Sequence, residues 1–158
     1  MSDDQPLRDH LRKLLDWEDA HVGFDRAIDG LPARLRGQSP EGWAHSPWQL
    51  LEHLRICQFD ILDFCRNASY AEMPMEKYWP SSASPPTDKA WKESVAGFRR
   101  DREELKRLAA DRTIDLFARI PHGDGQTYLR ELLLVADHNA YHVGQLVALR
   151  RALGAWKD

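Results

Sequence analysis

The sequence predicts an all-α protein, a four-helix bundle with one long crossover connection. Three observations support this fold class. Apolar residues recur every three or four positions in four segments, no segment alternates apolar and polar residues as a strand would, and a long proline-rich stretch separates the second segment from the third. The 158 residues, of which 42% are apolar, suit a single domain, which we expect to span residues 1–158.

The first two helices are predicted from apolar spacing and from their ends. The first is expected over residues 6–29, where its apolar stripe contains Leu7, Leu11, Leu14, Leu15, Val22 and Ile28. The second begins after Ser46, which stands at the N-cap, with Pro47 at the first helical position and Gln49 at the third. This order is typical of a capping box, so the helix should extend to about Asn67.

The third and fourth helices follow the proline-rich stretch. Residues 69–86 contain four prolines and cannot be helical throughout, so we expect them to cross the length of the bundle and make the second and third helices parallel. Thr87 should cap the third helix, which ends at about Ala110. Thr127 should open the fourth helix, which extends to Leu153 and stops at Gly154.

Charge and composition exclude several classes of function. Lys and Arg number 22 against 25 Asp and Glu, and no basic stretch is interleaved with aromatic residues, so we expect no nucleic-acid partner. The N-terminus is acidic and polar, and no apolar run approaches the roughly 20 residues of a membrane span, so we expect a cytoplasmic protein with no membrane association. Cys57 and Cys65 are eight residues apart on one predicted helix, too far for a disulfide, and should be buried free thiols.

Three histidines are the candidate metal ligands. His138 and His142 are four residues apart on the fourth helix, so their imidazoles project from the same apolar face. His53 lies among apolar positions of the second helix. A single histidine on such a face is more often a hydrogen-bonded core residue, but two buried side by side favour a shared cation. The spacing therefore predicts a metal site with open coordination positions.

Such a site has a limited range of chemistry. Three neutral imidazoles suit zinc or nickel, with iron or copper as alternatives. A bound thiol or water would lose its proton near neutral pH and become a nucleophile. Glu131, two turns before His138, is the candidate catalytic carboxylate, and Asp60 is the second choice. Cys57 as a fourth ligand would instead close the site.

His53, together with the run from Asp137 to Gln145 that contains His138 and His142, resembles the metal triad of the DinB-like superfamily, which includes YfiT-type metal-dependent hydrolases. The resemblance covers essentially the whole chain. It implies a four-helix bundle that binds a divalent metal through His53, His138 and His142 and forms a dimer. It also implies transferase or isomerase chemistry with a low-molecular-weight thiol such as bacillithiol or mycothiol as one option.

We therefore expect a metal-dependent enzyme, either a thiol S-transferase or a hydrolase, in which a small thiol or water attacks an electrophilic small molecule. The alternative is a non-catalytic metal- or ligand-binding bundle. A homodimer is also expected, because the back of the fourth helix carries Ala136, Ala140 and Gly144 at every fourth position. This strip of small residues allows another helix to approach closely, either from a second subunit or from within the chain.

Overall fold

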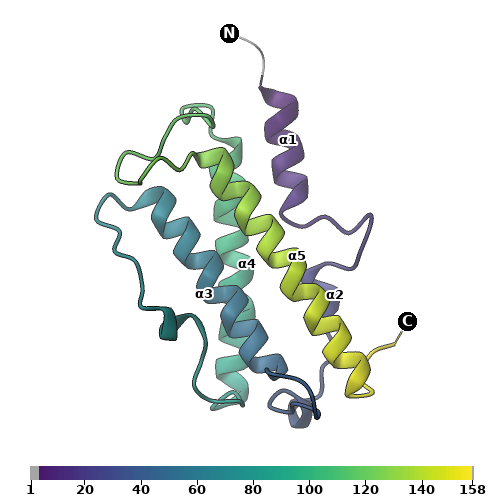
Figure 1. Ribbon diagram of the computed structural model, residues 1–158. Coiled ribbons are helices and arrows are strands. Elements are labelled where there is room, and N and C mark those ends of the chain that lie inside the picture. The colour runs from purple at the N-terminus through teal and green to yellow at the C-terminus, as the bar shows by residue number, and fades with distance from the viewer. Residues whose placement is uncertain (1–3, 158) are drawn as a thin grey trace.

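The computed structural model describes residues 4–157 and forms a bundle of four main helices (Figure 1). These helices are α1 (Gln5–Leu14), α3 (Pro47–Arg66), α4 (Asp88–Ala110) and α5 (Tyr128–Ala152). The shorter elements are α2 (Phe24–Ile28) and two 3₁₀ turns, η1 (Ala33–Leu35) and η2 (Met75–Tyr78). Residues 4–157 contain no strand beyond an isolated antiparallel bridge, which confirms the predicted all-α class.

Three of the four predicted helices begin where their caps indicated. Ser46 Oγ accepts a hydrogen bond from the Gln49 amide at 3.2 Å, and Gln49 Oε1 accepts one from the Ser46 amide at 3.0 Å, so the capping box is complete. Thr87 and Thr127 cap α4 and α5 through their hydroxyl oxygens. Beyond the end of α5, Gly154 adopts a φ of 65°, a left-handed conformation that glycine tolerates at a helix end.

The prediction of one continuous first helix over residues 6–29 is wrong. Helix α1 ends at Leu14, residues 15–23 are irregular, and α2 begins only at Phe24. The intervening segment carries Asp16, Glu18 and Asp19, whose negative charges are unfavourable at the carboxyl end of a helix. It also offers no buried apolar side chain between Leu15 and Phe24, so nothing anchors a further helical turn to the core.

The long crossover makes α3 and α4 parallel, as predicted. At their amino ends Trp48 lies against Trp91, and at their carboxyl ends Arg66 pairs with Glu104 at 2.6 Å. The crossover of residues 67–87 runs beside α3 from one end of the bundle to the other, and α1 and α5 run in the opposite direction (Figure 1).

The buried interior consists of two apolar clusters. One gathers around the amino ends of α3 and α4 and the carboxyl end of α5, and the other around the opposite ends with α1. Several buried polar side chains, among them Gln58 and Asn139, lie on the helices between the two clusters. Buried polar groups need hydrogen-bond partners, so these side chains are expected to make specific interactions. None of the helices in residues 4–157 is long and apolar enough to cross a membrane.

Candidate metal centre

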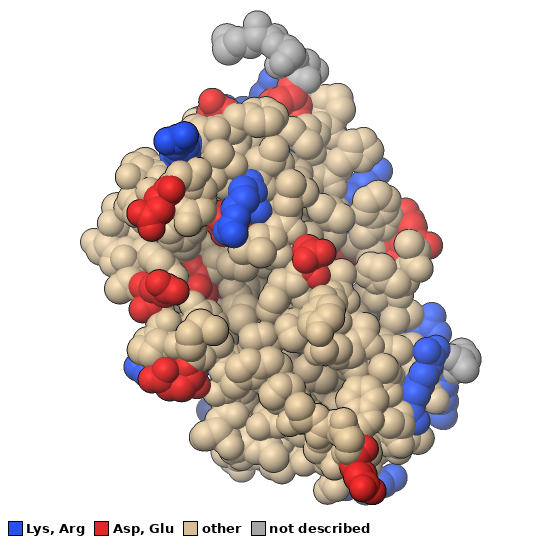
Figure 2. Space-filling model, in the orientation of Figure 1, with Lys and Arg blue, Asp and Glu red and all other residues tan. Residues whose placement is uncertain are grey.

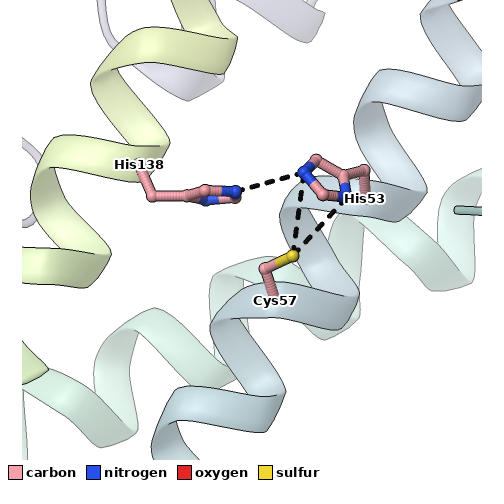
Figure 3. A group of neighbouring side chains, drawn as sticks. All are labelled: His53, Cys57 and His138. Carbon is pink, nitrogen blue, oxygen red and sulfur yellow. Dashed lines mark hydrogen bonds between the residues drawn. The ribbon is translucent and has the colours of Figure 1, made fainter. Parts of the chain in front are cut away.

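The three predicted histidines meet between α3 and α5. The Nε2 atom of His53 lies 3.2 Å from Nε2 of His142 and 3.2 Å from Nε2 of His138. Figure 3 shows His53 reaching from α3 and His138 from α5 toward each other, with Cys57 beside His53. Two residues that are 85 and 89 positions from His53 in the sequence thus both lie against its Nε2 atom.

The hydrogen bonds of the Nδ1 atoms determine whether the Nε2 atom of the same ring presents a lone pair. His53 Nδ1 donates to the backbone oxygen of Tyr78 at 2.8 Å, and His142 Nδ1 donates to Gln145 Oε1 at 2.8 Å. Because Nδ1 carries the proton in each neutral ring, Nε2 presents a lone pair. Two lone pairs at 3.2 Å have no proton to share, whereas a cation between them would satisfy both. Two nitrogen ligands on a tetrahedral zinc ion stand about 3.3 Å apart, so the observed spacing fits a metal.

Cys57 belongs to the same cluster. Its Sγ lies 3.5 Å from Nδ1 and 3.7 Å from Nε2 of His53. One ligand atom from each of His53, Cys57 and His138 falls within 4.8 Å of the others, so the described residues contain a possible metal site of two histidines and one cysteine. This group differs from the predicted set of three histidines, because it contains Cys57 and not His142, although His142 Nε2 lies 3.2 Å from Nε2 of His53. Burial raises the pKa of the Cys57 thiol to about 12. Cys57 and Cys65 are both free and buried, as predicted.

The electrostatics keep the imidazoles neutral. Burial lowers the pKa of His138 to about 4, with a further contribution from His142 and His53. Burial also lowers the pKa of His53 and of His142, although the hydrogen bonds to the Tyr78 carbonyl and to Gln145 partly oppose it. Neutral imidazole is the form that binds a metal, so the cluster is ready to act as a ligand set at neutral pH.

The crossover supplies one wall of the site. Trp79 stacks on His53 with ring centroids 3.7 Å apart, and His45 stacks on Trp79 at the same distance. Tyr78 and Trp79 are therefore the crossover residues that contact His53. What the sequence did not reveal is that a backbone carbonyl, at Tyr78, orients His53, because no side-chain pattern marks such an acceptor.

The two predicted carboxylates lie to one side of the histidines. Glu131 is buried and its carboxylate pairs with Arg130 at 2.6 Å. Asp60 accepts hydrogen bonds from the hydroxyls of Tyr70 and Tyr78, and burial raises its pKa. Both line a cavity of about 340 Å³ next to the cluster, and Figure 2 shows a hollow on this face of the molecule. Tyr78 joins the cavity to the cluster, since its hydroxyl faces Asp60 and its carbonyl faces His53.

His21, on the segment between α1 and α2, lies away from the three histidines. His21 is exposed, its ring contacts the carbonyl of Val22, and it lines cavities on another face of α5. It is therefore outside the cluster of His53, His138 and His142.

Comparison with known proteins identifies a single family. A family profile described as the DinB superfamily matches residues 16–146. That range includes His53, Cys57, His138 and His142. No curated protein and no solved structure matches the chain.

Proposed function

Since this chain belongs to the DinB superfamily, we propose that it holds one divalent metal ion through the Nε2 atoms of His53, His138 and His142. The observation that supports this most directly is the position of His53 Nε2, 3.2 Å from Nε2 of each of the other two rings. Zinc or nickel suits three imidazoles best, and iron or copper is an alternative.

The choice between His142 and Cys57 decides whether the site is open. Three histidines leave at least one coordination position for a substrate, whereas Cys57 as a fourth ligand would give a closed structural site. We favour the three histidines because they bind without losing a proton, while the buried Cys57 thiol has a pKa of about 12 and must be deprotonated first.

Metal analysis of two variants tests this ligand set. The protein is purified without chelator or nickel resin, and its metal content is compared with that of His142→Ala and of Cys57→Ser. We expect His142→Ala to lose most of its metal and Cys57→Ser to keep it. The reverse result would assign the ion to His53, Cys57 and His138.

The proposed activity is the attack of a small thiol, or of water, on an electrophilic small molecule. A divalent ion held by neutral imidazoles keeps its full charge and lowers the pKa of a thiol or water beside it. The chain itself covers one side of His53 with Trp79, and a cavity lined by Asp60, Tyr78 and Glu131 lies beside this wall. Low-molecular-weight thiols are the first co-substrates to test.

Proton transfer in this reaction requires a carboxylate near the cluster. Glu131 was the first choice from the sequence, but its carboxylate is paired with Arg130. Asp60 has stronger support, because burial raises its pKa and it binds the hydroxyl of Tyr78, whose carbonyl contacts His53. We therefore keep Glu131 as a candidate and place Asp60 beside it.

A non-catalytic metal-binding bundle is the competing function. The two functions are separated by an assay of small thiols with electrophiles, run on the metal-loaded and the metal-stripped protein. Turnover that disappears with the metal and returns with zinc or nickel supports the enzyme. Full metal occupancy without turnover on any thiol or with water would favour the structural role.

We also propose that the protein is a homodimer that uses the back of α5. Ala140 and Gly144 are exposed, and a Cβ placed on Gly144 would meet no heavy atom within 4 Å. Residues 4–157 therefore leave this part of the small-residue strip uncovered, although Ala136 is buried. A groove along the strip continues to Val147 and Trp156, which gives a second copy room to approach.

A further inference from the structure

A buried chain of amide groups connects three helices behind His138. Gln58, on α3, is fully buried, and its Nε2 donates to the backbone oxygen of Phe98, on α4, at 2.7 Å. Its Oε1 accepts a hydrogen bond from Nδ2 of Asn139, on α5, at 2.9 Å. These amides lie between the two apolar clusters, where an unpaired polar atom costs about 1–3 kcal/mol.

The chain of hydrogen bonds has only one possible direction. A backbone oxygen can only accept, so Gln58 must turn its NH₂ group toward Phe98 and its oxygen toward Asn139. Asn139 must then present its own NH₂ group to Gln58. This leaves Oδ1 of Asn139 as a buried acceptor, and it has no hydrogen-bond partner.

His138, the residue before Asn139, carries a buried ring nitrogen that also lacks a hydrogen-bond partner. This nitrogen is Nδ1, in contrast to the Nδ1 atoms of His53 and His142, which donate to the Tyr78 carbonyl and to Gln145. In addition, the Asn139 side chain raises the pKa of His138, as an acceptor close to the ring does, against the larger lowering by burial.

We propose that Asn139 is a positioning residue whose Oδ1 accepts the Nδ1 proton of His138, and that Gln58 fixes Asn139 for this role. This inference rests on the proposed three-histidine site. With Nδ1 protonated, His138 presents the lone pair of Nε2 to the cluster, as the other two rings do. The Nδ1 atom of each histidine then has its own acceptor. His53 has the Tyr78 carbonyl of the crossover, and His142 has Gln145 on α5. His138 has Asn139, which the hydrogen bonds of Gln58 hold in place.

The proposal has a measurable consequence for metal binding. Loss of a group that orients a metal-bound histidine reduces metal affinity by roughly 10- to 100-fold. Without the Asn139 oxygen, the ring of His138 has no acceptor to hold the proton on Nδ1, and the tautomer with the proton on Nε2 cannot bind the metal through that atom.

Zinc affinity of three variants tests the inference, measured by competition with a chromophoric chelator. Asn139→Leu removes the proposed acceptor at similar size, and Gln58→Met releases Asn139 without removing it. Gln145→Leu removes the acceptor of His142 and is the matched reference. We expect Asn139→Leu and Gln145→Leu each to weaken zinc binding roughly 10- to 100-fold, and Gln58→Met to weaken it less.

A nitrogen NMR measurement of the His138 tautomer in the wild-type protein keeps the test independent of variant folding. We expect the proton on Nδ1, both with and without zinc. The proton on Nε2, or zinc affinity of a folded Asn139→Leu within twofold of wild type while Gln145→Leu is weakened, would overturn the inference and leave the metal site standing. Wild-type protein that binds no zinc would instead refute the proposed function.

Discussion

Acidifying the metal-free protein should destabilise it, and His138 should account for a measurable share of the loss. Burial lowers the pKa of this imidazole to about 4 in the folded protein, from 6.5 as the ordinary value. Between these two values the unfolded chain binds a proton that the folded chain does not. The free energy of unfolding therefore falls as the pH drops from 6.5 toward 4.

The magnitude follows from the two pKa values. For one group shifted in this way, linkage gives a loss of about 2 kcal/mol between about pH 7.5 and about pH 5. The ring of His138 is only partly buried, so solvent screening reduces the expected loss to about 1–2 kcal/mol. His53 and His142 also have lowered pKa values and add to the total.

Urea unfolding in the presence of a chelator, followed by circular dichroism at the two pH values, measures this effect. His138→Gln removes the titrating group, and His10→Gln, at an exposed position of α1, is the matched control. We expect the pH dependence of the free energy of unfolding to decrease by about 1–2 kcal/mol in His138→Gln and to stay unchanged in His10→Gln. A full wild-type dependence in His138→Gln would refute the reasoning.

Three further outcomes are expected. Arg8→Leu should lower the free energy of unfolding by about 2–4 kcal/mol in a denaturant titration, because this buried guanidinium donates to three backbone oxygens at and just beyond the end of α4. A loss below about 0.5 kcal/mol would contradict that role. In steady-state kinetics on the metal-loaded enzyme, Asp60→Asn should reduce kcat about 10-fold or more without reducing metal content, and Glu131→Gln should reduce kcat less. If a variant loses metal to the same extent as it loses kcat, the substituted residue has a structural role. Gly144→Trp should shift the protein from dimer to monomer in sedimentation velocity by overpacking the exposed strip, and an unmodified protein that is monomeric at micromolar concentration would rule the dimer out.

The sequence alone determined the elements whose signals are local. Ser46 with Gln49, Thr87 and Thr127 each place a side-chain oxygen next to free amides at a helix start, and such a contact needs no tertiary partner. The spacing of His138 and His142 put both rings on one face of a helix for the same reason. These signals sufficed to predict the bundle, the crossover and the histidines to examine.

Tertiary structure decided the features that depend on contacts between distant segments. The break between Leu14 and Phe24 depends on where the core offers something to bury, and periodicity within the segment carries no such information. The approach of His53 to His138, the carbonyl of Tyr78 behind His53 and the proximity of Cys57 all arise from how α3, α5 and the crossover pack. Whether Cys57 or His142 joins His53 and His138 therefore depends on how these elements pack, and residue spacing along a chain does not determine that packing.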